Sequence, residues 1–156
     1  MKTGVYAGSF DPFTNGHLYV AKQACELFDK VVTAICVNSN KTRRVDQEKM
    51  RQAVTETFKA EGLTNAQAVI YSGLVVDLAK EAGAQFLIRG LRNGTDYEYE
   101  ENIADINHEL TGIKTIYFRA GETSYISSAM VMEVLKYNGD IAKWVPESVL
   151  KAILNN

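Results

Sequence analysis

Short apolar runs alternate with segments of helical periodicity along almost the whole chain. The apolar runs are rich in β-branched and aromatic residues and show little polar alternation, which is typical of parallel strands buried on both faces. They predict strands at Thr3–Ala7, Val31–Val37, Ala68–Tyr71, Gln85–Ile88 and Thr115–Phe118. The other segments predict helices near Gly16–Phe28, Gln47–Ala60, Val75–Ala82, Asp96–Leu110, Ser128–Tyr137 and Pro146–Leu154.

This alternation predicts an α/β fold: a single doubly wound, five-stranded parallel sheet with helices on both faces. There is no internal repeat, low-complexity tract or linker, so residues 1–156 are expected to form a single domain. Ligands of such sheets bind beyond the carboxyl ends of the strands. The chemistry is therefore expected in the loops after the strands: Gly8–Asn15, Asn38–Asp46, Ser72–Leu74, Arg89–Gly94 and Ala120–Ser127.

Several residues have the chemistry of helix ends. Thr95 and Glu98 have the spacing of a capping box, and Pro146 suits the first turn of the last helix. Four glycines stand where a left-handed C-terminal cap is expected: Gly62, Gly83, Gly112 and Gly139.

The composition limits the ligands and the location. Hydrophobic residues make up 46% and charged residues 23%, as in ordinary soluble globular proteins, and the net charge is −2. This charge argues against broad binding to nucleic acid or an anionic membrane, so a phosphate ligand needs local cationic side chains. Cys25 and Cys36 form no CxxC motif, which favours a reduced compartment without structural zinc. With no signal pattern and no apolar run of membrane-spanning length, a soluble cytoplasmic protein is expected.

The stretch Gly8–His17 is the most informative segment, because it joins the first expected strand to the first expected helix. Its small residues allow close approach of a ligand, and the helix start offers unpaired N–H groups and a positive dipole end. Both features are typical of an anionic phosphate site. In the first helical turn, a protonated or donor imidazole of His17 can stabilise charge that develops on a phosphoryl group. The alternative is a histidine paired with a local backbone carbonyl. His108, on a polar helix face, is interpreted as solvated surface.

Residues in the first two loops supply hydroxyl and cationic groups. Ser9 follows the first strand directly, which places its hydroxyl to bond a phosphate oxygen, whereas Asp11 is expected to shape the turn through an Asx bond. Lys41 can neutralise a phosphate as a point charge. Alternatively, it belongs to a solvated basic loop together with Arg43 and Arg44.

A second group of candidates lies in the later loops. Arg89 follows apolar residues at the mouth of an expected buried strand, where its guanidinium needs a partner: a bound phosphate, or a helix carboxylate. In the acidic run that follows, only Tyr99 and Glu100 are considered for ligand contacts, because the rest suits a helix start. Hydroxyl residues near another helix start predict a second anion-binding site: Thr123, Ser124, Ser127 and Ser128. The alternative is that Ser127 only caps this helix, and both roles are compatible.

The segment Thr14–His17 resembles the His/Thr-x-Gly-His signature of the nucleotidyltransferase superfamily. The chain is similar to the bacterial phosphopantetheine adenylyltransferase family over essentially its whole length. The further motifs that carry this resemblance follow the order of that family: Gly8–Pro12, Ile88–Arg92, Asp96–Glu100 and Ile126–Ser128. The resemblance implies a Rossmann-like nucleotidyltransferase fold. It also implies transfer of the adenylyl group of ATP to 4′-phosphopantetheine in coenzyme A biosynthesis, with Mg²⁺ accompanying the nucleotide. A homohexamer and feedback inhibition by coenzyme A are implied in the same way.

The resemblance assigns roles to individual residues. His17 matches the histidine that stabilises the transition state, and Ser9 and Lys41 match the other catalytic positions. Ser9, Lys41, Val75 and Arg89 match positions that bind 4′-phosphopantetheine. The ATP-binding positions are matched by Ser9, Phe10, His17, Gly90, Leu91, Arg92, Glu100, Thr123, Ser124, Tyr125, Ile126, Ser127, Ser128 and Ala129. No residue is assigned as a metal ligand.

Some positions depart from the family pattern. Ala7 stands where proline is common, Gly73 replaces an acidic residue, and Ala129 replaces a third serine. Lys41 is followed by Thr42–Val45 rather than by the more usual Lys-Pro and hydrophobic residues. The nucleotide assignments therefore rest on a closer match than the acceptor assignments.

Two other functions remain open from the sequence. An adenylyltransferase for another phosphate acceptor, such as nicotinate mononucleotide, would share His17 but lack the Arg89-to-Glu100 pattern. A nucleotide-binding regulatory module without turnover would not require His17.

Overall fold

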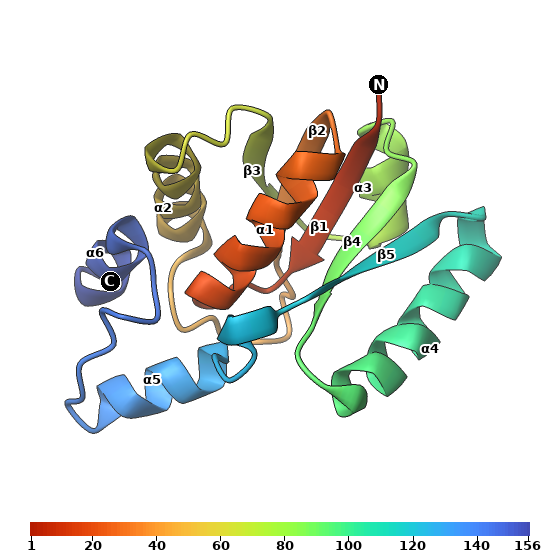
Figure 1. Cartoon of the computed structure of the whole chain (residues 1–156). Helices are drawn as coiled ribbons and strands as arrows, with labels where there is room; N and C mark the ends of the chain where they lie inside the picture. The colour runs from red at the N-terminus through yellow and green to blue at the C-terminus, as the bar shows by residue number, and fades with distance from the viewer.

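Five parallel strands form one sheet in the computed structural model, which describes residues 1–156 (Figure 1). They are β1 (Thr3–Gly8), β2 (Lys30–Cys36), β3 (Ala66–Tyr71), β4 (Phe86–Leu91) and β5 (Lys114–Arg119). Their order across the sheet is β3-β2-β1-β4-β5, and every neighbouring pair is parallel. The chain winds outward from β1 first in one direction and then in the other, which confirms the predicted doubly wound α/β fold.

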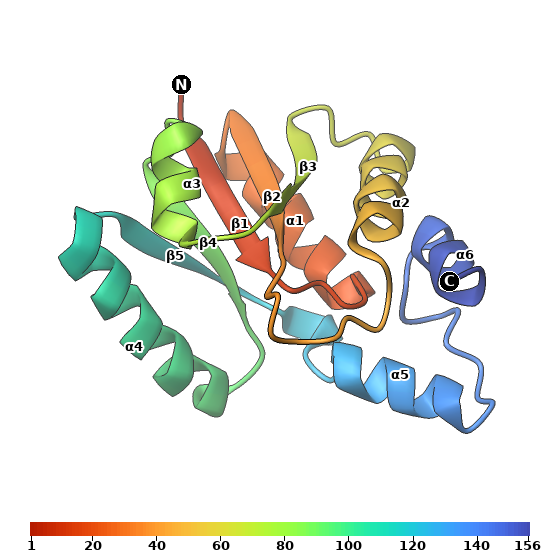
Figure 2. The same ribbon diagram turned by 180° about the vertical axis from the view of Figure 1, so that it is seen from behind.

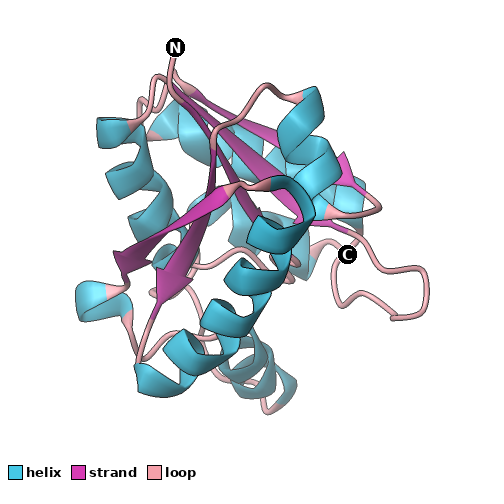
Figure 3. Cartoon of the chain, turned by 90° about the vertical axis from the view of Figure 1, so that its right-hand side faces the viewer, coloured by secondary structure: helices cyan, strands magenta, loops and turns pink.

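Helices cover both faces of this sheet. They are α1 (Asn15–Leu27), α2 (Gln47–Ala60), α3 (Val75–Glu81), α4 (Gly94–Thr111), α5 (Ser128–Lys136) and α6 (Glu147–Leu154), with a short 3-10 turn at Gly121–Thr123. α1 packs against β2, β4 and β5, whereas α3 packs against β1, and α4 against β4 and β5. Figures 1 and 2 show α1 on one face and α3 with α4 on the other, and Figure 3 gives a side view. None of these helices has both the length and the apolar composition that a membrane crossing requires.

The central strands β1 and β2 are largely apolar because successive side chains point to opposite faces and both faces are buried. On β1, Tyr6 belongs to a large core cluster that includes residues of α1, α2, α5 and α6. Val5 and Ala7 belong to a smaller cluster that includes residues of α3. All three side chains are at most 4% exposed, so no position of this strand has to be polar.

The fourth strand is longer than its sequence pattern predicts. The sequence predicts a loop from Arg89 onward, but β4 continues through Leu91 because these residues pair with the end of β5. Arg89 and Gly90 are therefore strand residues. Pro146 is the N-cap residue of α6. It therefore stands directly before the first helical turn, whereas the sequence places it within that turn. The remaining element boundaries agree with the prediction to within two residues.

The chemistry of the helix ends is predicted only in part. Three of the four expected glycines have positive φ angles, but after α5 Asn138 (φ 63°) takes the left-handed conformation instead of Gly139. Asparagine tolerates this region better than most residues. The prediction of a capping box between Thr95 and Glu98 is wrong. Asn93 caps α4 instead, because its side chain accepts the N–H of Asp96 at 3.0 Å.

Gly90 allows α1 to pack directly on β4. A Cβ added at Gly90 would stand 2.8 Å from Cγ2 of Val20, and a β-branched valine has few rotamers with which to move aside. We expect Gly90→Ala to lower the free energy of unfolding by about 1–3 kcal/mol, the usual cost of overpacking. Urea denaturation measures the difference. Gly94→Ala is the matched control, since nothing lies within 4 Å of its added Cβ. A Gly90→Ala protein as stable as the wild type would contradict this close packing.

Candidate active site

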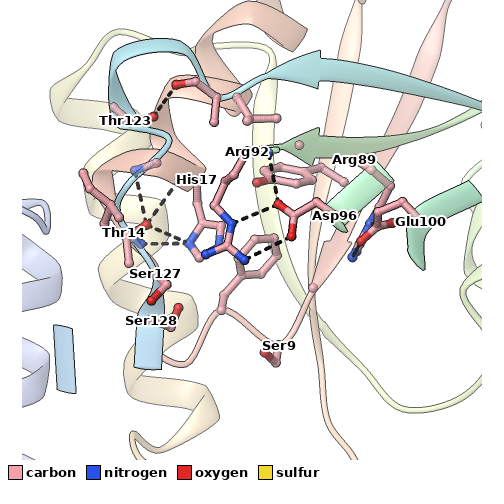
Figure 4. A pocket seen from close by; sticks show the side chains of 18 of the residues that line it. Ser9, Thr14, His17, Arg89, Arg92, Asp96, Glu100, Thr123, Ser127 and Ser128 are labelled. Atoms are coloured by element: carbon pink, nitrogen blue, oxygen red, sulfur yellow. Dashed lines mark hydrogen bonds and ion pairs between the residues drawn. The ribbon is translucent and has the colours of Figure 1, made fainter. Parts of the chain in front are cut away.

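A polar cavity lies where the strand order reverses, between β1 and β4. Its volume is about 260 Å³, and its lining comes from the ends of β1 and β4 and the starts of α1, α4 and α5. Figure 4 shows side chains from these elements around His17 and Arg92. This is the place where a doubly wound sheet is expected to bind its ligand. The predicted site residues that line this first cavity are Ser9, Phe10, His17, Arg89, Gly90, Arg92, Glu100, Thr123, Ile126, Ser127 and Ser128.

The contacts of His17 determine which of its ring nitrogens holds a proton. Thr14 is the N-cap of α1, and its backbone N–H donates to Nδ1 of His17 at 2.9 Å (Figure 4). Since a backbone N–H can only donate, Nδ1 is the unprotonated acceptor, and the proton of the neutral ring is on Nε2. The alternative of a histidine paired with a backbone carbonyl is therefore wrong, and His17 retains an Nε2–H donor.

The surroundings of His17 keep the ring neutral. Burial, together with the positive charges of Arg89 and Arg92, lowers its pKa to about 3. Phe10 meets the ring edge-on with centroids 4.9 Å apart, and the Phe13 ring lies at 5.5 Å. Of the two forms that the sequence leaves open, the neutral donor is the one present at neutral pH.

We expect His17 to destabilise the folded protein in a defined acidic window. Its pKa is about 6.5 in an unfolded chain and about 3 in the folded protein. Between these values the unfolded state binds the extra proton, so stability falls as the pH decreases, by up to about 1.4 kcal/mol per pH unit. Urea denaturation at about pH 6.5 and pH 4.5 measures this effect, with His17→Gln as the reference that lacks a titrating ring. The wild type should lose about 2 kcal/mol more than this variant; equal losses would contradict a neutral His17 with a lowered pKa.

The N–H groups at the start of α1 are already satisfied. Thr14 Oγ1 accepts the N–H groups of Gly16 and His17 at 3.2 and 3.4 Å. The N–H of Asn15 donates to the Trp144 carbonyl at 2.8 Å. The prediction that this helix start offers unpaired N–H groups to a phosphate is therefore wrong, because a threonine cap and a later segment occupy them. The donor that remains at this end of α1 is the imidazole.

The start of α5 forms another part of the cavity wall. Ser127 is the N-cap, as predicted, and its hydroxyl accepts the N–H of Met130 at 3.1 Å. The hydroxyl of Ser128 donates to the Pro12 carbonyl at 2.7 Å, which ties α5 to the loop after β1. The N–H groups of the first helical turn before Met130 have no intrahelical partner, so this helix start keeps donors that suit an anion.

Arg89 pairs with a helix carboxylate. Its Nε and Nη2 donate to the carboxylate of Glu100 at 2.7 and 2.6 Å, and its Nη1 donates to the carbonyl of Ala7. Burial lowers the pKa of Arg89, but the Glu100 carboxylate, together with Tyr6 and Cys36, outweighs burial, and the net pKa is raised. The sequence leaves a phosphate and a helix carboxylate open as partners of Arg89, and the structure shows the carboxylate of Glu100 in this role. The Glu100 side chain is itself buried.

Arg92 pairs with a carboxylate that the sequence does not single out. Asp96 accepts the backbone N–H, Nε and Nη2 of Arg92 at 3.0–3.2 Å. These bonds raise the pKa of Arg92 and lower that of Asp96. Asp96 lines the first cavity, and its position four residues after Arg92 is a signal that could have revealed the pair. Tyr99, which the sequence favours, is 66% exposed and lines no part of the cavity.

A second cavity, of about 290 Å³, lies against α3 and α4. It shares Ala7, Gly8, Ser9, Arg89 and Glu100 with the first cavity. Most of its lining is apolar, including Val75 and Leu87. A polar cavity and a largely apolar cavity therefore meet at Ser9 and the Arg89–Glu100 pair.

Some predicted site residues lie outside both cavities. Lys41 is exposed on the loop between β2 and α2. The Asx bond predicted for Asp11 within its own turn is wrong, because the Asp11 carboxylate accepts the backbone N–H groups of Arg44 and Val45 in the loop after β2. The assigned ATP-binding residues that line neither cavity are Leu91, Ser124, Tyr125 and Ala129. Their assignments stay predictions.

Comparison with known proteins identifies the family. The cytidylyltransferase-like family pattern matches residues 5–134. A phosphopantetheine adenylyltransferase of Streptococcus pneumoniae (strain Taiwan19F-14) is 45% identical over 157 residues, covering 99% of this chain and 96% of the relative. Another, from Lachnoclostridium phytofermentans, is 44% identical and covers 98% of this chain and 94% of the relative. The chain belongs to the phosphopantetheine adenylyltransferase family.

The fold is shared more widely than the sequence of this family. A crystal structure from Vibrio parahaemolyticus, described as a nicotinate-nucleotide adenylyltransferase, has a TM-score of 0.74 and covers 99% of this chain and 93% of its own. At 19% identity, this likeness shows the fold alone. Membership of the phosphopantetheine adenylyltransferase family makes the chain a nucleotidyltransferase, as the Thr14–His17 signature predicts.

Proposed function

We propose that the enzyme transfers the adenylyl group of ATP to 4′-phosphopantetheine, giving 3′-dephospho-coenzyme A and pyrophosphate. The observation that supports this reaction is the meeting of two cavities at Ser9 and the Arg89–Glu100 pair. The polar cavity suits a nucleotide, and the largely apolar one suits a pantetheine arm. Relatives at 44–45% identity over nearly the whole chain have the corresponding name.

The reaction requires little covalent chemistry from the protein. An oxygen of the acceptor phosphate forms a bond to the α-phosphorus of ATP. The bond between that phosphorus and the oxygen bridging to the β-phosphate breaks, and pyrophosphate leaves. Because the acceptor phosphate is already an anion, no general base is needed, and positioning with charge stabilisation supplies the rate.

His17 is the residue proposed to stabilise the transition state. Negative charge builds on the oxygens of the α-phosphate during the attack, and a donor fixed in advance stabilises that charge effectively. The bond from the Thr14 N–H to Nδ1 fixes the ring, and the neutral Nε2–H is the available donor. Ser9, which lines both cavities, is proposed to contact both substrates through its hydroxyl.

The other polar groups of the first cavity are proposed to hold ATP. First-turn N–H groups of α5 suit phosphate oxygens, and Arg92, oriented by Asp96, adds a positive charge. Phe10, Gly90 and Glu100 line the same cavity and keep their nucleotide-binding assignments.

The acceptor phosphate is proposed to bind Arg89 and Lys41. Nη1 and Nη2 of Arg89 each have a second hydrogen beyond those bonded to Ala7 and Glu100, so the guanidinium can still bind a phosphate oxygen. Lys41 is exposed on its loop, and its flexible ammonium is proposed to turn toward the acceptor when it binds. Val75, in the wall of the second cavity, is proposed to contact the pantetheine arm.

Mg²⁺ is proposed to enter as part of the nucleotide substrate. The chain has no group of three or more His, Cys, Asp or Glu side chains placed to hold a metal ion. The carboxylates of the first cavity, Asp96 and Glu100, are bonded to arginines. Phosphate oxygens of ATP are therefore the expected ligands, and the ion neutralises part of the triphosphate charge when bound.

Assembly, inhibition and location belong to the same proposal. We propose a homohexamer, as the family resemblance implies. Apolar side chains that α4 leaves 57–66% exposed support association of the subunits, namely Tyr99, Ile106 and Leu110. Coenzyme A is proposed as a feedback inhibitor, because it contains both a pantetheine arm and an adenine nucleotide. The free thiols of Cys25 and Cys36 agree with action in the reducing cytoplasm.

Product analysis tests the proposed reaction. The enzyme, ATP, Mg²⁺ and 4′-phosphopantetheine are expected to yield 3′-dephospho-coenzyme A, identified by mass spectrometry, and an equal amount of pyrophosphate. Pantetheine is the control acceptor, and it should give no adenylylated product because it lacks the nucleophilic phosphate. Release of inorganic phosphate in place of pyrophosphate would contradict adenylyl transfer.

A further inference from the structure

A mostly buried arginine outside both cavities joins the loops that follow β1 and β2. The Arg43 side chain is 12% exposed. Its Nη1 donates to the Ser9 carbonyl at 2.8 Å, and its Nη2 donates to the Phe10 carbonyl at 3.3 Å. Its Nε donates to the carbonyl of Val45, in its own loop, at 3.0 Å. One guanidinium therefore spans both loops.

Asp11 completes the contact between the loops. Its carboxylate lies 3.6 Å from Nη2 of Arg43 and accepts the backbone N–H groups of Arg44 and Val45 at 2.7 and 2.9 Å. Nη1 of Arg44 donates in return to the Asp11 carbonyl at 3.0 Å. We refer to these contacts between residues 9–11 and residues 43–45 as the loop clamp.

The loop clamp holds Phe10 in a conformation that a bulky residue rarely adopts. Phe10 has a φ of 43°, in the left-handed region that favours glycine. Such a conformation persists only where the surrounding contacts over-determine it. The bond from Arg43 to the Phe10 carbonyl is one such contact. Another is the packing of the Phe10 ring edge-on against His17, with centroids 4.9 Å apart.

We propose that Arg43 is a positioning residue for adenylyl transfer, which acts on His17 through the loop clamp and Phe10. Its kinetic consequences rest on the proposed function. Arg43 lines neither cavity, so its effect reaches the reaction through the backbone of Ser9 and Phe10.

Kinetics of Arg43→Ala and Arg43→Lys test the proposal, at a temperature well below the Tm of each variant. We expect Arg43→Ala to lower kcat about 30- to 100-fold and to change the KM for ATP less than about threefold. The reason is that a catalytic donor misplaced by about 1 Å can lower the reaction rate by up to about 100-fold. Arg43→Lys keeps the charge but loses the fork that reaches two carbonyls, so a smaller loss of about five- to tenfold is expected. Arg51→Ala is the matched control with unchanged kcat, since Arg51 pairs with Glu48 along the exposed side of α2.

The nitrogen-15 resonances of His17 in the free protein give a second readout. Arg43→Ala should shift or broaden them, whereas Arg51→Ala should not. A kcat of Arg43→Ala within about twofold of the wild type overturns the proposal, and so does a loss of kcat with unchanged His17 resonances. If Arg43→Ala does not fold, Arg43→Lys is judged by the same two criteria. A wild-type enzyme that adenylylates no 4′-phosphopantetheine would refute the proposed function, while the resonances would still decide whether Arg43 positions His17.

Discussion

Replacement of His17 by alanine is expected to lower kcat about 100- to 1,000-fold and to change the Kd for ATP less than about fivefold. The Nε2–H interacts with charge that develops on the α-phosphate, and this charge is larger in the transition state than in bound ATP. An interaction made mainly in the transition state affects turnover more than substrate binding. Pyrophosphate release gives kcat, and titration calorimetry gives the Kd for ATP.

The chain provides a matched control in its other histidine. His108 is exposed in the last turn of α4, so His108→Ala should keep the wild-type kcat. A kcat of His17→Ala within about tenfold of the wild type would contradict the proposed role, because one preorganised donor usually contributes about 100-fold or more. An equal loss of ATP affinity and kcat would instead assign His17 to substrate binding.

Replacement of Arg89 by alanine is expected to weaken acceptor binding and the fold together. The Kd for 4′-phosphopantetheine should rise about 10- to 100-fold, since hydrogen bonds to charged groups contribute about 1.5–3 kcal/mol. The variant also leaves Glu100, whose side chain is 9% exposed, without its partner. Breaking a buried pair costs about 3–5 kcal/mol. Because the Arg89 side chain is 31% exposed, we expect the free energy of unfolding to fall by about 3 kcal/mol, which is the lower end of that range.

A second substitution separates these two effects of Arg89. In the double variant Arg89→Ala, Glu100→Gln, the uncompensated buried charge is gone, so much of the stability should return while acceptor binding stays weak. Chemical denaturation and titration with 4′-phosphopantetheine measure the two quantities. An unchanged Kd in Arg89→Ala would refute the assignment to the acceptor phosphate, and unchanged stability would contradict the buried ion pair.

Most of the fold can be predicted from the sequence because the central strands are buried on both faces. β1 and β2 appear as largely apolar runs, for example Val31–Ile35 with Thr33 as its one polar residue, since neither face requires polar residues. The end of β4 cannot be predicted in this way. Arg89 and Gly90 interrupt the apolar pattern, because one extends into the cavities and the other makes room for α1, yet both pair with β5.

The position of the site can also be predicted, but the pairing of its side chains cannot. His17 lines the first cavity because a strand-to-helix turn lies at the ligand-binding edge of any such sheet. Its bonding partner has a sequence signal: Thr14 and His17 have the spacing of a capping box with histidine at the third helical position. In contrast, the pairing of Arg89 with Glu100 depends on how α4 packs against β4. The bonds of Arg43 to Ser9 and Phe10 join residues 33 to 34 positions apart, which no local pattern reveals.

The choice of acceptor tests the central claim most directly. Pyrophosphate release from ATP is measured with 4′-phosphopantetheine and with nicotinate mononucleotide, using one enzyme preparation. Nicotinate mononucleotide has a phosphate but no long arm to occupy the second cavity. We expect kcat/KM for 4′-phosphopantetheine to be higher by about 1,000-fold or more, because binding energy from the arm is available in the transition state. Equal values, or a preference for nicotinate mononucleotide, would contradict the proposed acceptor.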